Sequence, residues 1–308
     1  MSGTWTDSVK AHHKEGYASE MSRIQILESR SGQLNPLLFC CGGGGRNIGR
    51  ELKKLDAVSV DTSHGADILL DQETLSIREM RPQLLRYADL PFIGRMRSLL
   101  KGHDAAFVVT GLGGFAGGSG AAVIAKAASA LSVPVIVSAA LPFAVEGGMR
   151  RAEARRDLDI LRENASLTAA FENNIILEST PGMKMTQALS VMNRIVSSPL
   201  AELLRHVDTE WARSLTGKHY RCTYSVDYSA GEGWEKRAVH ALLAQAHEAG
   251  GRTDKACLFV ESADVPEESA AGIAGEMERV SGARMITVWA GKRDTEGQNR
   301  VAALMLSE

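Results

Sequence analysis

The sequence predicts an α/β fold, in which a doubly wound, mostly parallel sheet is followed by a smaller α+β domain. Short apolar runs typical of buried strands, such as 37–41 (LLFCC) and 105–110 (AAFVVT), alternate with segments typical of helices. Glycine-rich segments directly follow both of these runs. That arrangement is typical of parallel sheets in which a tight turn leads from each strand into a helix. After about residue 215, strands become more frequent, which indicates a second domain.

The first domain is expected to consist of strand–helix units with short connections. Strands are expected at 37–41, 57–61, 105–110, 133–138 and 175–177. Helices are expected at 46–55, 121–131 and 148–164, and the last of these carries the densely charged sequence RRAEARRDLDILRE, typical of a solvated face. A long central helix is expected at 184–205, with a break at Pro199. It would join the two domains.

Domain boundaries follow from these elements. Residues 1–34 are polar and expected to form a flexible N-terminal extension, in which 21–28 could form a short helix. Residues 35–205 would form the nucleotide-binding domain with the central helix, and residues 206–308 the C-terminal α+β domain. In that domain, strands are expected at 221–226, 255–261, 284–290 and 300–307, and helices at 234–249 and 266–280.

Composition excludes several classes of protein. The 308-residue chain has a net charge of −2, so no global field attracts nucleic acid or an anionic membrane. The longest apolar run, 133–145, is too short to span a bilayer and contains two prolines, so no direct membrane insertion is expected. Four cysteines show neither metal nor disulfide spacing, and no metal ligands are assigned. A cytoplasmic protein is expected.

The most informative segment is 110–122, TGLGGFAGGSGAA, which lies between an expected strand and an expected helix. Glycines allow close approach of a ligand to the backbone, free N–H groups point outward, and the helix dipole favours negative charge. The segment therefore favours a phosphate-binding loop, although a plain hinge is an alternative.

Two familiar nucleotide motifs fit this loop poorly. A P-loop requires a lysine where this chain has Ser119, so that interpretation fails. Gly111, Gly113 and Ala116 satisfy the dinucleotide pattern GxGxxA, but the following strand ends without the acidic residue that would bind a ribose. A Rossmann-type dinucleotide enzyme stays open as an alternative.

A third pattern is more specific. The chain combines CGGGGRN (41–47), GGFAGGSG (113–120) and a strand that leads through PF into EGGMR (146–150), followed by FENN (171–174). In their order and spacing these segments resemble the tubulin/FtsZ superfamily over about 35–308. The chain ends shortly after its last expected strand. It is therefore expected to be a divergent FtsZ-like protein, such as an archaeal FtsZ or CetZ type.

The resemblance implies binding of GTP or GDP, and Mg²⁺ could accompany GTP. The residues that it assigns to the nucleotide are Gly43, Gly44, Gly45, Asn47, Asp61, Thr62, Gly114, Gly117, Gly118, Ser119, Gly120, Glu146, Arg150, Asn173 and Asn193. Among these, Glu146 would accept hydrogen bonds from the ribose and Arg150 would contact phosphate. Without the resemblance, Glu146 and Arg150 would be interpreted as a surface pair at the start of a helix.

The catalytic segment departs from the family pattern. The resemblance implies that acidic residues after the central helix polarise water at the neighbouring subunit's γ-phosphate, and here they would be Asp208 and Glu210. His206 and Trp211 replace an asparagine and an aspartate of that pattern, so slow or absent hydrolysis is expected. An ordinary helix–loop junction is the alternative role of this segment. Arg194 replaces an aspartate that contacts guanine in the family, which leaves base selectivity open.

The resemblance implies a cytoskeletal protein whose subunits stack head to tail around GTP, in cell division or cell shape. Such contacts do not close and so produce filaments. The expected partner is another copy of this chain, or another FtsZ-like protein if this chain is a non-catalytic regulator of filaments. No nucleic acid partner is expected.

Overall fold

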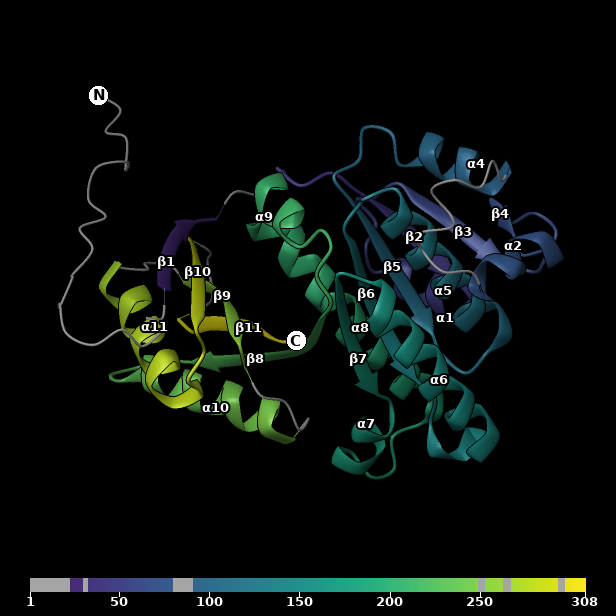
Figure 1. Ribbon diagram of the computed structural model, residues 1–308. Helices are drawn as coiled ribbons and strands as arrows, with labels where there is room; N and C mark the ends of the chain where they lie inside the picture. The colour runs from purple at the N-terminus through teal and green to yellow at the C-terminus, as the bar shows by residue number, and fades with distance from the viewer. Residues whose placement is uncertain (1–22, 30–32, 80–90, 249–252, 263–266, 293–296) are drawn as a thin grey trace.

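The computed structural model describes residues 23–29, 33–79, 91–248, 253–262, 267–292 and 297–308 (Figure 1). Within this part of the chain, the strands form one sheet with the order β1-β10-β9-β11-β8-β7-β6-β5-β2-β3-β4. Figure 1 shows the two halves of the sheet side by side, with helices α8 and α9 between them. The predicted α/β class is confirmed.

The first half of the sheet is entirely parallel. Its strands are β2 (Pro36–Cys41), β3 (Ala57–Asp61), β4 (Ile68–Leu69), β5 (Ala105–Gly111), β6 (Val135–Leu141) and β7 (Leu167–Glu172). Alternate residues of β2 enter different cores: Leu37 and Phe39 pack on one face, and Leu38 and Cys40 on the other. The sheet is therefore buried on both faces, as parallel sheets require.

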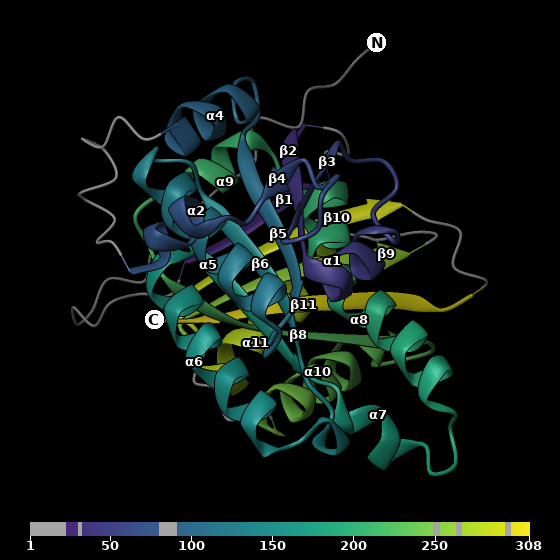
Figure 2. The same cartoon turned by 90° about the vertical axis from the view of Figure 1, so that its right-hand side faces the viewer.

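Helices cover both faces of this half-sheet (Figure 2). They are α1 (Gly42–Gly49), α2 (Gln72–Ser76), α4 (Pro91–Leu99), α5 (Phe115–Ala130), α6 (Gly148–Asn164), α7 (Asn174–Ser179) and α8 (Met185–His206), with the 3₁₀ turns η1 (Ile77–Glu79) and η2 (Ala144–Glu146). Helices α4, α5 and α6 share the first core, and α1 and α8 share the second. The sequence also predicts a helical region at 78–102, interrupted at Pro82 and at Leu90–Pro91; its residues 80–90 lie outside the described residues, and α4 forms much of the rest.

After α8, a short helix α9 (Thr209–Ser214) leads into the C-terminal half. Its elements are β8 (Tyr220–Ser229), α10 (Trp234–Glu248), β9 (Lys255–Ser262), α11 (Glu267–Ser281), β10 (Met285–Lys292) and β11 (Asn299–Ser307). Strand β11 runs antiparallel to β8 and β9, which makes this half mixed. Helices α10 and α11 bury a third core against it.

Several expected elements differ from the structure. The apolar run 175–177 lies in helix α7 and not in a strand. The break expected at Pro199 is wrong, because helix α8 continues through this residue; the Ser197 and Ser198 hydroxyls donate to the carbonyl of Arg194 in the preceding turn, at 2.9 and 2.7 Å. Both glycine-rich segments are helical: α1 begins at Gly42 and α5 at Phe115, earlier than expected.

The helix expected at 21–28 is also wrong. Residues Arg23–Glu28 form strand β1, which pairs in parallel with β10 at the edge of the C-terminal half. In this register Ile24 pairs with Ile286, and the half-buried Ile26 packs against the core under α10 and α11. This segment of the expected flexible extension thus belongs to the sheet, and it links the C-terminal half to β2.

Candidate functional site

Two helix N-termini open side by side at the carboxyl edge of the parallel sheet. Helix α1 follows β2 directly, and α5 follows the neighbouring strand β5 after a short loop. Their N-cap residues, Cys41 and Gly114, make no side-chain capping bond, and neither first turn contains an acidic residue. The first backbone N–H groups of both helices thus have no partner within the helix, and both dipoles favour an anion here.

Glycines allow the two first turns to approach each other. A Cβ at Gly42 would lie 2.9 Å from the amide nitrogen of Gly117. A Cβ at Gly117 would lie 2.2 Å from the Gly111 carbonyl oxygen, and one at Gly45 would lie 2.4 Å from that of Val109. These backbone contacts leave no room for a side chain. We call the two first turns, 42–45 and 114–117, the glycine edge.

The predicted binding glycines occupy different positions at this edge. Gly43 and Gly44 are exposed, and a Cβ at Gly43 would meet nothing within 4 Å. Gly114 is the N-cap of α5, and Gly117 lies in its first turn. Gly45 and Gly117 are buried in the contacts just described. The open backbone surface therefore consists of Gly43 and Gly44 together with the start of α5.

Gly118, Ser119 and Gly120 lie farther along α5 and are buried. The Gly118 amide already donates to the Gly114 carbonyl at 2.9 Å. Ser119 accepts a hydrogen bond from Arg78, and Gly120 packs against Val60, Leu70 and Cys41. In this structure these residues pack the helix against its neighbours, and their predicted role in phosphate binding stays a prediction.

Charged side chains flank the glycine edge. Arg46 of α1 lies 2.9 Å from the carboxylate of Asp61 at the end of β3, and Asp61 also accepts a 2.7 Å bond from the Thr62 amide. The exposed Asn47 accepts a bond from Arg50 on the same helix. The guanidinium of Arg46 is half exposed, so it adds positive charge beside the two helix N-termini.

The segment between β6 and α6 forms the opposite flank. Glu146 accepts a 2.8 Å bond from the Phe143 amide and lies 3.2 Å from Arg150, one turn later. A Cβ at Gly114 would lie 3.7 Å from Nη2 of Arg150, which therefore reaches the N-cap of α5. Glu146 and Arg150 are thus a helix-start pair and also neighbours of the glycine edge.

Besides Nε of Arg78, two buried polar atoms on this side of the sheet have no hydrogen-bond partner among the described residues. They are Oγ1 of Thr110, which lies beside Gly117, and Oδ1 of Asn173, after the end of β7. A buried polar atom without a partner costs about 1–3 kcal/mol. The two uncapped helix starts without acidic residues, rather than these buried atoms, are what make the residues present fit the phosphates of a nucleotide. Asn193 is half-buried on α8, the helix that packs beside α1.

The predicted catalytic residues lie at the amino ends of the parallel strands, opposite the glycine edge. Asp208 caps α9 by accepting a 2.9 Å bond from the Trp211 amide. Thr209, in the first turn of α9, donates to the Gln33 carbonyl and to Asp104, which precede β2 and β5. A strand of six residues extends about 20 Å. The structure therefore separates Asp208 and Glu210 from the glycine edge of the same chain.

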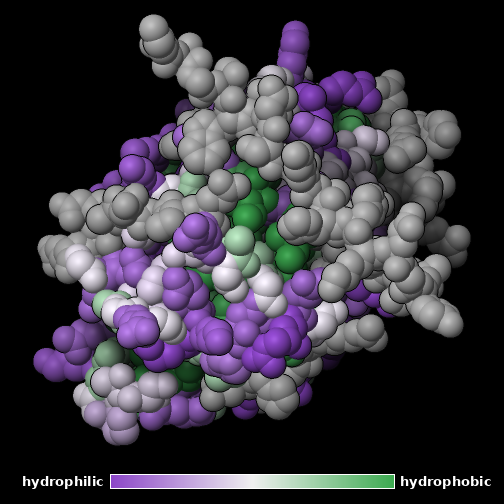
Figure 3. Space-filling view, turned by 90° about the vertical axis from the view of Figure 1, so that its left-hand side faces the viewer, coloured by the Kyte–Doolittle hydropathy of each residue, from purple (hydrophilic) through white to green (hydrophobic). Residues whose placement is uncertain are grey.

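Asp208 and Glu210 also line a cavity of about 680 Å³ between α9 and the β1 edge of the sheet. Its apolar lining includes Leu27 and two tryptophans, Trp211 and Trp289, in edge-to-face contact at 6.1 Å. Figure 3 shows hydrophobic side chains in the middle of this face, among hydrophilic ones. Sequence reasoning missed the cavity because it depends on β1.

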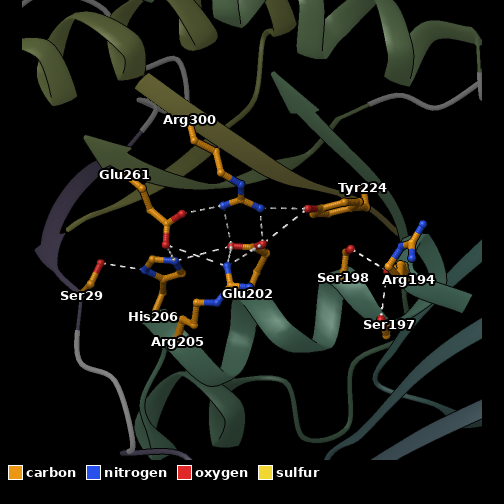
Figure 4. Close-up of polar contacts among 10 residues, drawn as sticks. All are labelled: Ser29, Arg194, Ser197, Ser198, Glu202, Arg205, His206, Tyr224, Glu261 and Arg300. Atoms are coloured by element: carbon orange, nitrogen blue, oxygen red, sulfur yellow. Dashed lines mark hydrogen bonds and ion pairs between the residues drawn. The ribbon is translucent and has the colours of Figure 1, made fainter. Parts of the chain in front are cut away.

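A group of ionisable side chains joins α8 to the C-terminal half of the sheet (Figure 4). Arg300 of β11 forms ion pairs with Glu202 of α8 and with Glu261 of β9, the latter at 3.0 Å. Tyr224 and His206 complete the group. We call these five residues the ion cluster. All except the half-buried Tyr224 are buried.

His206 lies between two carboxylates of the ion cluster. Its Nε2 is 3.5 Å from Glu202 and 3.6 Å from Glu261, and its Nδ1 is 2.7 Å from the Ser29 hydroxyl. Burial by itself lowers the pKa of His206, but the two carboxylates outweigh burial and raise its pKa overall. Burial by itself raises the pKa of Glu202, but hydrogen bonds from His206 and Arg300 outweigh burial and lower its pKa overall.

No helix in the described ranges is both long and apolar enough to cross a membrane. The same part of the chain contains no group of three or more His, Cys, Asp or Glu side chains placed to hold a metal ion.

Comparisons with known proteins agree with this architecture. No family model matches the chain. The chain is 30% identical over 179 residues to cell division protein FtsZ 1 of Halobacterium salinarum, which covers 53% of this chain and 45% of that protein. It is 32% identical over 171 residues to cell division protein FtsZ 1 of Archaeoglobus fulgidus, which covers 50% and 46% respectively. The matches thus span about half the length of these curated relatives.

Solved structures with the same fold extend over most of the chain. An empty FtsZ dimer from M. jannaschii matches with a TM-score of 0.71, 20% identity and coverage of 89% of this chain and 88% of that one. A GDP-bound CetZ1 monomer from Haloferax volcanii matches with a TM-score of 0.66, 18% identity and coverage of 88% and 94%. A GTPγS-bound CetZ2 protofilament from the same organism has a TM-score of 0.63, 19% identity and coverage of 89% and 94%.

Proposed function

We propose that this chain, a divergent FtsZ/tubulin-like protein in sequence and fold, binds a guanine nucleotide at the glycine edge and stacks head to tail into filaments. The observation that carries the proposal is the pair of uncapped helix N-termini, α1 and α5, at one edge of the parallel sheet. They supply free N–H groups and two aligned dipoles for the phosphates. Arg46 and Arg150 add positive charge on the two flanks.

Guanine is proposed because proteins of the same fold are described with GDP and GTPγS. The predicted ligands fit a nucleotide that lies across the edge: Asn173 has a buried, unpartnered oxygen, and Asn193 lies on the helix beside α1. If Mg²⁺ accompanies GTP, the phosphates would supply its ligands together with water. Titration calorimetry with GTP, GDP and ATP tests the assignment, and equal affinity for ATP and GTP would contradict guanine selectivity.

Stacking is supported by the two ends of the molecule. Exposed apolar side chains gather near the carboxyl edge, on the starts of helices and in a turn between them: Phe115, Val145, Met149 and Ile175. At the opposite edge, Asp208 and Glu210 adjoin an apolar cavity. Exposed apolar residues near an edge are typical of a contact surface. A second copy stacked in the same orientation would bring its acidic residues toward the bound nucleotide, which a single chain cannot do.

Sedimentation and electron microscopy with GTP, GTPγS or no nucleotide test assembly. Filaments that form only with nucleotide support the proposal, and nucleotide binding without assembly contradicts stacking. Met149→Glu is the informative variant, because Met149 is 91% exposed and a charge there should block a stacked neighbour without disturbing the fold. The control is Asp159→Asn, which changes the charge of another exposed side chain on the same helix, α6.

Hydrolysis is proposed to be slow or absent. Asp208 is already occupied as the cap of α9, and Trp211 follows it where the family pattern has an acidic residue. This observation also favours a second candidate function, in which the chain binds nucleotide and regulates filaments of another FtsZ-like protein without turnover. No phosphate release above background, with or without Asp208→Asn, would support that candidate, whereas a fast rate abolished by the substitution would contradict both statements.

A further inference from the structure

A buried ion pair lies directly behind the first turns of α5. Oδ1 of Asp157, on α6, is 2.8 Å from Nη2 of Arg78, on η1, and the Asp157 side chain is 2% exposed. Arg78 also donates from Nη1 to the Ser119 hydroxyl at 3.1 Å. The pair therefore joins three elements that are distant in sequence. One of them is the helix whose N-terminus forms part of the glycine edge.

The Asp157 carboxylate contacts the backbone of this helix start. Its Oδ2 accepts a long hydrogen bond, 3.4 Å, from the Gly113 amide. A Cβ at Gly118 would lie only 1.8 Å from Oδ2, so a glycine is required for the carboxylate to fit. A negative charge is thus held behind the turn whose front offers its N–H groups to the proposed phosphates.

The Asp157 carboxylate is held in position by Arg78 and the Gly113 amide. Burial raises the pKa of Asp157, and pairing with Arg78 and the bond from Gly113 oppose that rise. Arg78 itself is held from several sides: its backbone carbonyl accepts a bond from Lys126, and Glu153 lies 3.6 Å from Nη2. The Arg78 side chain is 20% exposed, so water screens the pair only weakly.

A carboxylate at this position has opposite effects on the site. It accepts the Gly113 bond and orders the loop, but it also repels an anion that binds at the front of the same turn. We infer that Arg78 is a positioning residue that neutralises Asp157 and thereby allows the α5 loop to bind a polyphosphate. The inference rests on the proposed function of the glycine edge and deepens it, because it assigns the phosphate affinity partly to residues behind the loop.

The experiment is a double-mutant cycle on the full chain. The variants are Arg78→Met, Asp157→Asn and the double variant, and calorimetry measures Kd for guanosine, GDP and GTP. The matched control is Arg156→Met, which removes another arginine that pairs with Glu153, but from a side chain that is 73% exposed. An unneutralised charge at this depth should weaken GTP binding about tenfold.

The expected pattern follows from charge. Arg78→Met weakens GTP most, GDP less and guanosine not at all, and adding Asp157→Asn restores GTP affinity to within about threefold of the original. Asp157→Asn alone and Arg156→Met leave GTP affinity equal or improve it. Equal losses for guanosine and GTP, or a double variant as weak as Arg78→Met, would overturn the inference, because both results indicate a purely structural role.

The inference can be tested even if Arg78→Met does not fold. If Arg78→Met fails to fold, Arg78→Lys and Asp157→Asn carry the test: the charge-retaining variant should bind GTP within about threefold of the original protein, and the neutral asparagine should not weaken GTP binding. A loss of GTP affinity in either variant overturns the inference. An original protein that binds no nucleotide instead contradicts the proposed function, and hydrogen exchange then tests whether Asp157 orders the Gly113 amide.

Discussion

The glycine edge and the ion cluster differ in whether their polar groups have partners within the chain. At the glycine edge, the first backbone N–H groups of α1 and α5 have no partner within their own helices, and glycines keep side chains away from them. In the ion cluster, the buried carboxylates of Glu202 and Glu261 are paired, chiefly by Arg300. Unpaired polar groups near a surface indicate a binding site, whereas paired ones in the interior indicate a fixed joint between two halves of the fold.

The comparison predicts that the ion cluster tolerates the loss of a partner least. Arg300→Met leaves two buried carboxylates without their common cation, and breaking a buried pair in this way costs about 3–5 kcal/mol. Urea unfolding should show this loss, while GTP affinity at low temperature stays within about twofold, because the glycine edge is remote. A variant of unchanged stability would show that the cluster is not the joint that its burial indicates.

The control for this prediction is an exposed pair. Arg156 and Glu153, on α6, lie 3.3 Å apart, and the arginine side chain is 73% exposed. Because water screens such pairs, Arg156→Met should leave the unfolding midpoint almost unchanged.

Gly117→Ala tests the glycine edge and should have the next largest effect. The new methyl group would lie 2.2 Å from the Gly111 carbonyl, so the backbone must move, at a cost of about 1–3 kcal/mol. The displacement should also abolish nucleotide binding in a calorimetric titration.

Gly43→Ala is its counterpart, because a Cβ there meets nothing within 4 Å. Alanine favours a helix by up to about 1 kcal/mol over glycine, so this variant should be as stable as the original or more stable. Its GTP affinity should nevertheless fall, since the methyl group projects at the open face. Unchanged affinity in Gly43→Ala would place the phosphates elsewhere.

The two regions also differ in how far sequence alone could predict them. The glycine edge was predictable, because glycine runs after apolar strands are local patterns with a direct physical meaning. The sequence predicts later starts for α1 and α5 than the structure has, since glycine has a low helix propensity.

The ion cluster was not predictable, because its members come from α8, β8, β9 and β11 and meet only in the folded chain. Asp157 was missed for a related reason: the dense charge around it is typical of a solvated helix face, and its partner Arg78 lies far away in sequence. Strand β1 likewise depends on β10 near the other end of the chain. Short apolar runs such as 175–177 are ambiguous between strand and helix.

A smaller effect is expected at Asp208, where a cap and a proposed catalytic group coincide. Asp208→Ala removes the bond to the Trp211 amide and should cost about 1 kcal/mol of stability. Asp208→Asn keeps a good cap but removes the charge, so stability should be retained. Any GTP turnover of the original protein that survives Asp208→Asn would assign this residue to capping alone, and turnover lost in both variants would assign it a catalytic role.

The smallest expected effect is a pH dependence that originates in the ion cluster. The pKa of His206 is raised above its ordinary value of 6.5, because the carboxylates of Glu202 and Glu261 outweigh the effect of burial. A group with a raised folded-state pKa adds stability below its unfolded pKa and loses that contribution as the pH rises through the folded-state value. The unfolding free energy should therefore fall from pH 6 to pH 8 more steeply in the original protein than in His206→Gln. Arg205, which lies 3.9 Å from Glu261, opposes protonation and limits the size of the effect. Parallel pH profiles for the two proteins would show that His206 stays in one protonation state over this range.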